Sequence, residues 1–264
     1  MKKKIIALML AVLLGLAGVA ASAASSDYTD LIASIIQTME DNDAQCESAP
    51  QETANGAYRA VEMLALMAYR LDSTGAYSSF VSEYLDLLEK NDESTTDATL
   101  QTANGLYRCV ELLTIIALEE DADSEYKDLI FDIQGSLYDN NDRLTSAVQQ
   151  GVNGAYRMVE MLAVLAYENG VADSRIQGVL ESWQSADSSA SGASQQLANG
   201  LYRAAELVYL IADSVDAEGL WSDYLSDRID SLYTYNQSLE GAPQQSANGI
   251  YRVVELLGGW AALL

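Results

Sequence analysis

The sequence has 264 residues, of which 39 are acidic and 14 are basic, so its formal net charge at pH 7 is −25. Such a chain repels nucleic acids and anionic lipid surfaces and favours cationic partners. It contains no histidine, which removes the commonest general base and the commonest transition-metal ligand. We therefore predict no nucleic-acid partner, no bound metal and no cofactor.

The first 23 residues have the pattern of a secretory signal peptide. Three lysines precede an apolar run, and Ala21-Ser22-Ala23 fits a cleavage site. The run is short for a membrane-spanning helix, which needs about 20 residues. We expect residues 1–23 to be removed and the remainder to be exported to the exterior of a bacterial cell, without membrane association. An uncleaved membrane anchor is the alternative.

After this segment the chain repeats the motif Asn-Gly-x-Tyr-Arg-x-x-Glu. The motif asparagines are separated by 49, 49, 46 and 49 residues. Self-similarity at a fixed period of this length is the signature of a repeat architecture. We therefore interpret the chain as five copies of one structural unit.

The first half of each repeat predicts an amphipathic helix. In residues 27–39, for example, Ile32, Ile36 and Met39 fall on one face and acidic residues on the other, as the 3.6-residue period requires. Acidic, turn-like stretches follow each of these helices. Comparable patterns occupy residues 80–90, 126–138, 174–183 and 220–233.

The second half of each repeat carries the motif and is apolar on most sides, which is typical of a buried helix. Seven residues before each motif asparagine stands a serine, aspartate or glycine, and each of these is an acceptable N-cap. We predict the motif helices near residues 49–71, 98–119, 147–169, 193–213 and 242–262.

The predicted fold is all-α, with five tandem αα-hairpin repeats of about 46–49 residues in a single domain, residues 24–264. The last predicted helix has no polar face after Glu255, although the terminal repeat of an open solenoid needs one. Closure into an α/α toroid, with the motif helices inside, would cover this helix. A strongly curved solenoid is the alternative.

Each motif helix carries one narrow polar stripe. The motif Asn, Arg and Glu, together with a Glu or Gln three residues before the Asn, fall within about 80° of arc, and the motif Tyr flanks them. In a ring we expect the five stripes to converge on the axis near the N-terminal ends of the helices. The candidate binding residues are Asn55, Tyr58, Arg59, Glu62, Asn104, Tyr107, Arg108, Glu111, Asn153, Tyr156, Arg157, Glu160, Asn199, Tyr202, Arg203, Glu206, Asn248, Tyr251, Arg252 and Glu255.

Two interpretations of the stripe remain open. In the first it is a structural ladder, because a buried arginine must be paired, here with a glutamate of its own helix or of the next repeat. In the second it binds a small anionic or sugar-like ligand through arginines and helix N-termini. The glutamates would neutralise the arginines, which favours the ladder.

The motif glycines further predict a neighbouring backbone too close for a methyl group.

These patterns predict a secreted, non-catalytic binding or scaffold protein, with an extracellular protein, a glycan or a cationic molecule as partner. No catalytic residue is assigned, because no serine has a histidine to activate it and arginine-paired glutamates stay ionised. The alternative is a carbohydrate-active enzyme or a small-ligand-binding protein that uses the stripe as a central site.

The two cysteines, Cys46 and Cys109, leave two further alternatives open. An exported chain with two cysteines can form one disulfide, and these two lie close to the first and second motif helices. Otherwise both thiols are free. A zinc site with only two such ligands is implausible.

Overall fold

The structure is a computed structural model that describes residues 25–264. All regular secondary structure in this part of the chain is α-helical, which confirms the predicted all-α class. The predicted signal peptide, residues 1–23, lies outside the described residues. The helices are α2 (Ser25–Asp43), α3 (Ala49–Leu71), α4 (Ser78–Ser94), α5 (Ala98–Glu120), α6 (Lys127–Asn141), α7 (Ala147–Glu168), α8 (Asp173–Ser188), α9 (Ala193–Val215), α10 (Ser222–Ser238) and α11 (Ala242–Ala261).

The motif helices are α3, α5, α7, α9 and α11, and their ends lie within two residues of the ranges read from the sequence. Each begins after the N-cap residue that the sequence indicates. At Asp97 the side chain accepts a hydrogen bond from the backbone N–H of Thr99 at 2.8 Å, which satisfies one of the unpaired donors of the first turn.

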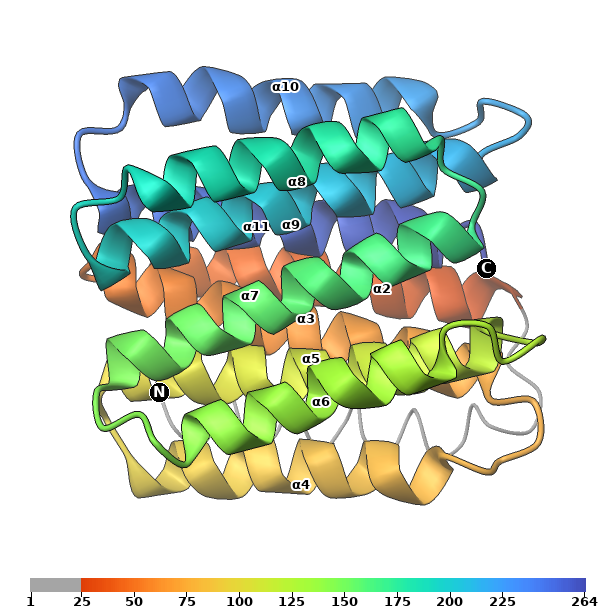
Figure 1. Cartoon of the computed structure of the whole chain (residues 1–264), viewed down its shortest axis with the longest axis horizontal. Coiled ribbons are helices and arrows are strands. Elements are labelled where there is room, and N and C mark those ends of the chain that lie inside the picture. Colours follow the sequence, from red (N-terminus) through yellow and green to blue (C-terminus); the bar gives the residue numbers. More distant parts are fainter. Residues whose placement is uncertain (1–24) are drawn as a thin grey trace.

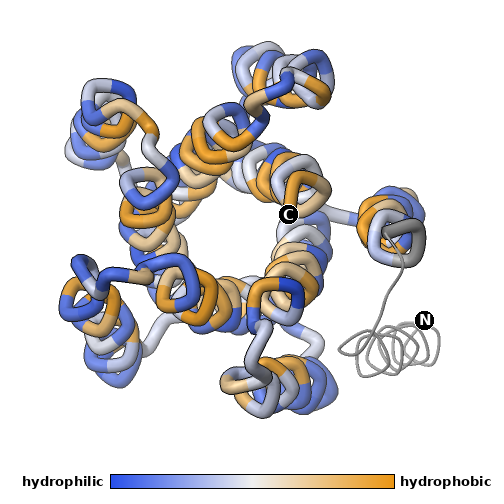
Figure 2. The backbone as a smooth tube through the Cα atoms, turned by 90° about the vertical axis from the view of Figure 1, so that its right-hand side faces the viewer, coloured by the Kyte–Doolittle hydropathy of each residue, from blue (hydrophilic) through white to orange (hydrophobic). Residues whose placement is uncertain are grey.

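The motif helices lie side by side around a common axis, and the other helices lie outside them (Figure 2). Helix α3 packs against α5, α5 against α7, α7 against α9 and α9 against α11, and α11 packs in turn against α3. Each outer helix contacts the motif helix that follows it in the chain and one neighbouring motif helix. Helix α4, for example, contacts both α5 and α3 (Figure 1).

The motif glycines allow neighbouring motif helices to approach closely. A Cβ atom on Gly105 would lie 2.8 Å from Cβ of Ala57 and 3.3 Å from its carbonyl carbon, which is closer than packed atoms come. The corresponding atom on Gly56 would lie 2.6 Å from Cγ2 of Ile250. The close approach expected from the sequence is thus confirmed at these positions. Moreover, α3 meets α11 in the same way as α5 meets α3.

The apolar C-terminal half of α11 is covered by the first two described helices. A Cβ on Gly258 would meet Ile36 of α2 and Met63 of α3, and Trp260 is fully buried. Helix α2 therefore hides the surface that an open array would leave in water. Within the described part of the chain, no helix is both long and apolar enough to cross a membrane.

Candidate functional site

The polar stripe of each motif helix faces the outer helices rather than the central axis. The side-chain amide of Asn55 donates to the carbonyl oxygen of Met39 at 2.9 Å, and that of Asn153 donates to Leu137 at 3.0 Å. Asn104, Asn199 and Asn248 make the equivalent bond to the preceding outer helix. The expected convergence of the stripes on the axis is therefore wrong, because the hydrogen bonds of the motif amides are made across the two layers.

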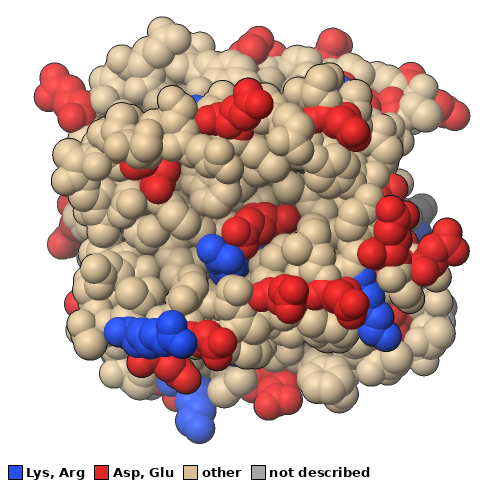
Figure 3. Space-filling model, in the orientation of Figure 1, with Lys and Arg blue, Asp and Glu red and all other residues tan. Residues whose placement is uncertain are grey.

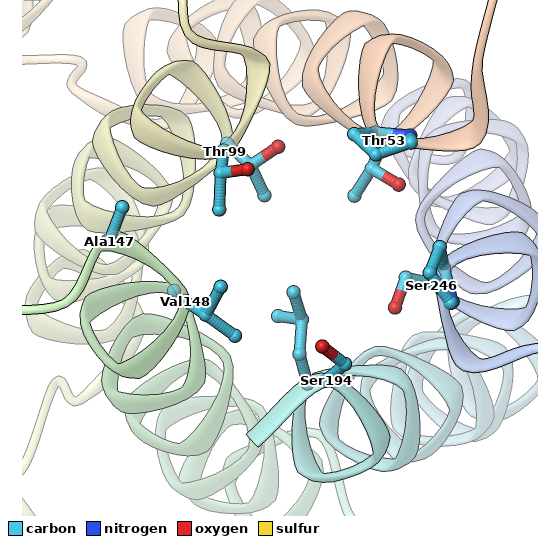
Figure 4. Close-up of a pocket in the computed structure, with 11 residues that line it drawn as sticks. Thr53, Thr99, Ala147, Val148, Ser194 and Ser246 are labelled. Atoms are coloured by element: carbon cyan, nitrogen blue, oxygen red, sulfur yellow. The ribbon is translucent and has the colours of Figure 1, made fainter. Parts of the chain in front are cut away.

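The axis is lined instead by small and apolar side chains near the N-terminal ends of the motif helices (Figure 4). The cavity there has a volume of about 70 Å³. The hydroxyls of Thr53, Thr102 and Ser246 donate to carbonyls of their own helices, four residues back. No motif Arg or Glu lines this cavity.

Every motif arginine pairs with the motif glutamate three residues further along its own helix. The Nη1–Oε2 distance is 2.6 Å for Arg59–Glu62 and Arg157–Glu160, and 2.5 Å for Arg203–Glu206 and Arg252–Glu255. Arg108 and Glu111 form the remaining pair. The ladder interpretation allowed each arginine to pair with a glutamate of its own helix or of the next repeat. In the structure the pairs form within one helix.

Burial differs strongly between these pairs. The side chains of Arg59 and Glu62 are 3% and 4% exposed, whereas those of Arg157 and Glu160 are 19% and 31% exposed. A buried ion pair depends on its partner far more than a solvated one does. The Nε atoms of the motif arginines are buried and have no hydrogen-bond partner among the described residues.

Burial also affects the protonation of the motif glutamates. It raises the pKa of Glu62, Glu160 and Glu255, while the paired arginine opposes the shift. The pKa of Glu111 rises to about 7 for the same reason, opposed by Arg108 and by the Tyr138 hydroxyl. Glu111 is only 4% exposed, so a substrate has no access to this carboxyl group.

Three outer-helix side chains complete the glutamate contacts, and the sequence analysis missed all three. The Tyr138 hydroxyl donates to Oε1 of Glu111 at 3.1 Å, and the Tyr233 hydroxyl donates to Oε1 of Glu206 at 3.2 Å. Arg228 donates to Oε1 of Glu255 at 3.0 Å. Tyr138 and Tyr233 lie 27 residues after their glutamates, whereas Arg228 lies 27 residues before Glu255. A search for polar residues at a constant offset from the motif would have found the two tyrosines but not Arg228.

The motif tyrosines connect consecutive repeats. The Tyr58 hydroxyl donates to Oδ1 of Asp92 at 3.0 Å, and Tyr156 donates to Asp187. Tyr251, in the last repeat, donates to Asp43 of the first at 2.6 Å. The ring of Tyr107 instead stacks on Tyr138, and that of Tyr202 lies against Tyr233.

Two surface grooves at consecutive repeat junctions contain motif residues, each with a volume of about 340 Å³. The first, which we call the α3–α5 groove, is lined by Asn42, Gln45, Cys46, Glu47, Gln51, Ala54, Asn55, Tyr58, Arg59, Asp92 and Gln101. The second, the α5–α7 groove, is lined by Asn91, Ser94, Thr95, Leu100, Ala103, Asn104, Tyr107, Arg108, Asn141 and Gln150. Both grooves thus combine the Asn, Tyr and Arg of one motif with the glutamine that precedes the next.

Both cysteines are free, so the candidate disulfide between Cys46 and Cys109 is not formed. Cys109 is fully buried on α5, with its sulfur 3.9 Å from the carbonyl oxygen of Ala57 on α3. Cys46 lies instead in the connection after α2, at the α3–α5 groove. Burial, together with Asp43 and Glu52, raises the pKa of the Cys46 thiol to about 11, so the thiol stays protonated at neutral pH.

Comparison of the chain with protein-family models, with curated proteins and with solved structures finds no match in any of the three. Among residues 25–264, no three or more Cys, Asp or Glu side chains come together in a group that could hold a metal ion. The contacts of the motif residues and the two grooves are therefore the observations from which a function can be argued.

Proposed function

We propose that the protein is an exported, non-catalytic binding or scaffold module, and that its motif stripe is mainly a structural ladder. The observation that carries this proposal is the use of the motif side chains within the molecule. The arginines pair with glutamates of the same helix, the asparagines bond to outer-helix carbonyls, and three of the five tyrosines bond to aspartates of the next repeat. The asparagine and tyrosine bonds join the two layers, and the arginine–glutamate pairs balance charge within each motif helix.

We further propose that residues 25–264 form a closed α/α toroid of five αα-hairpin repeats. The packing of α11 against α3 supports this architecture. The bond from Tyr251 in the last repeat to Asp43 in the first also supports it. This bond is equivalent to the bond from Tyr58 in the first repeat to Asp92 in the second. A single domain follows, because each inner helix has an inner neighbour on both sides.

The partner of this module is an extracellular protein, a glycan or a cationic molecule. The charge of −25 supports this range, because such a surface disfavours anionic partners. Acidic side chains are spread over the face shown in Figure 3, whereas Lys and Arg occupy only a few places on it. The favoured partner is therefore neutral or positively charged.

The ladder is tested by replacing the most deeply buried arginine. Arg59→Ala leaves the Glu62 carboxylate without its charge partner, and we expect a loss of about 3–5 kcal/mol in the free energy of unfolding. Urea unfolding followed by circular dichroism measures this loss. The control is Arg175→Ala, because Arg175 pairs with Asp213 at 3.0 Å through side chains that are 45% and 36% exposed. For this exposed pair we expect about 0–1 kcal/mol. Equal, small losses in both variants would contradict the ladder.

A further inference from the structure

We infer that the α3–α5 groove is a binding site for a neutral carbohydrate and that the α5–α7 groove is a second subsite for the same chain of sugars. This inference rests on the proposed binding function and names its ligand class. The reasons are the chemistry of the groove walls, their charge and the repetition of the groove at the next junction.

Carboxamide side chains dominate the walls of the α3–α5 groove. Asn42, Asn55, Gln45, Gln51 and Gln101 all line it. A carboxamide donates through its NH₂ group and accepts through its oxygen, so it matches a hydroxyl group, which also does both. A groove with this many adaptable partners suits a ligand that carries hydroxyl groups along its length.

Existing hydrogen bonds hold several of these side chains in place. Asn42 donates to Oδ1 of Asn55 at 3.3 Å, and the Gln51 side-chain oxygen accepts from the backbone N–H of Glu47 at 2.6 Å. Gln101 and Tyr58 both donate to Oδ1 of Asp92. Side chains fixed in this way lose little further conformational entropy when a ligand binds.

One polar group of the groove retains unused hydrogen-bonding capacity. The Asp92 carboxylate has about four lone-pair sites, so it can accept from a ligand hydroxyl as well as from Gln101 and Tyr58.

The charge of the groove excludes acidic ligands. Arg59 is the one basic side chain in its lining, and Glu62 neutralises it. Asp92 and Glu47 add negative charge, as does the rest of the protein. A phosphate, a carboxylate or an acidic sugar would therefore be repelled.

The size and repetition of the groove indicate a chain of sugars rather than a single large ligand. A volume of about 340 Å³ lies near the lower end of the ~300–1,000 Å³ range of ligand pockets. The α5–α7 groove has the same volume and presents Asn104, Arg108 and Gln150 at the equivalent motif positions. Two similar sites one repeat apart suit an oligomer of similar units, whose joint binding raises the overall affinity.

The test is isothermal titration of the protein with three neutral oligosaccharides, cellohexaose, maltohexaose and hexa-N-acetylchitohexaose. We expect saturable binding of at least one of them. Gln101→Ala in the α3–α5 groove and Gln150→Ala in the α5–α7 groove should each weaken binding about tenfold, the effect of losing one good hydrogen bond. An acidic oligomer of the same length, hexagalacturonate, should not bind.

The matched control is Gln37→Ala, which makes the same chemical change on α2 and lies in neither groove. It should bind like the unmodified protein. If Gln101→Ala does not fold, as judged by circular dichroism, Gln45→Ala replaces it, because Gln45 is an exposed residue of the same groove.

The inference is overturned if none of the three neutral sugars binds, or if the groove variants bind as tightly as Gln37→Ala. Binding of a neutral alanine–glycine peptide in place of the sugars, with the same loss in Gln101→Ala, would overturn it in favour of a peptide ligand. None of these outcomes changes the stability of Arg59→Ala, so the proposed ladder is tested separately.

Discussion

At the scale of single residues, the five motif arginines look alike in the sequence but differ in their surroundings. The exposed fraction of the arginine side chain rises from 3% for Arg59 to 19% for Arg157, although the motif around the two residues is the same. The i, i+3 spacing within the motif could predict the pairing itself. The sequence could not predict its depth, since depth is a property of the packed layers.

A buried carboxyl group lies at the C-terminal end of the motif helix α7. Both carboxylate oxygens of Glu168, in the last turn of α7, are buried and have no hydrogen-bond partner among the described residues. Burial, together with the nearby Glu120 and Asp121, raises the pKa of Glu168 to about 8. The folded protein therefore holds a proton on this group that the unfolded chain, with a pKa of about 4.3, releases.

This shift predicts a specific dependence of stability on pH. The contribution of Glu168 is fully present below about pH 4.3 and is lost as the pH rises through about 8. Glu168→Gln removes the titrating proton, so we expect a melting temperature a few degrees above that of the unmodified protein at about pH 9 and little difference at about pH 5. Differential scanning calorimetry at the two pH values measures the difference in melting temperature between the variant and the unmodified protein. A gain of the same size at both would show that the effect is not titration.

At the scale of helices, glycine is needed at the motif positions because neighbouring motif helices pack closely there, and not because the backbone adopts an unusual conformation. Gly105 lies mid-helix, where alanine is ordinarily better by about 1 kcal/mol. Its environment reverses that preference, because α3 lies too close for an added methyl group. The glycine spacing let the sequence predict close packing of the motif helices, although it did not show which neighbour each glycine contacts.

Gly105→Ala should therefore lower the free energy of unfolding by about 1–3 kcal/mol, the usual cost of overpacking. The control is Gly135→Ala on α6, where no atom lies within 4 Å of the added Cβ and the change should stabilise the protein by up to about 1 kcal/mol. Urea unfolding of both variants provides the comparison. Equal stabilisation in the two would mean that the α3–α5 interface is looser than described.

Another helix-scale feature has a regular spacing that the sequence analysis overlooked. Asp72, which ends α3, accepts a hydrogen bond from the backbone N–H of Tyr77 at 2.9 Å, and Asp216 accepts one from Trp221 at 2.8 Å. Burial by itself would raise the pKa of Asp72. The hydrogen bonds from Tyr77 and Ser78 outweigh burial and lower this pKa below its usual value. An aspartate five residues before an aromatic residue thus fixes the start of the next outer helix.

At the scale of the whole molecule, the described N-terminal end and the C-terminus lie on the same side (Figure 1). They occupy the place that a short connection fills between the other hairpins, such as the connection from Leu71 to Ser78. The apolar last helix allowed the sequence to predict closure as one of two architectures. It did not predict that the polar stripes would face outward, because helical periodicity gives the angle between positions but not which neighbour each face meets.

The proposed closure of the ring predicts that the chain tolerates a new starting point. We expect a circular permutant that joins Leu264 to Ser25 by a short glycine–serine linker, and opens at Gly170 between α7 and α8, to fold with nearly unchanged helicity and melting temperature. Circular dichroism measures both. A permutant opened between Leu112 and Leu113, which are fully buried in α5, is the control and should not fold. An unfolded Gly170 permutant would argue for an open array.

The contact between α3 and α11 also has an evolutionary consequence. Tandem DNA repeats gain and lose copies by recombination, and an open array accommodates such changes by becoming longer or shorter. In the proposed toroid each unit turns the chain through a fixed share of a full circle, so a sixth copy would overlap the first and a deletion would leave a gap. The number of copies is thus held by geometry, and the gene can vary its repeats in sequence much more freely than in number.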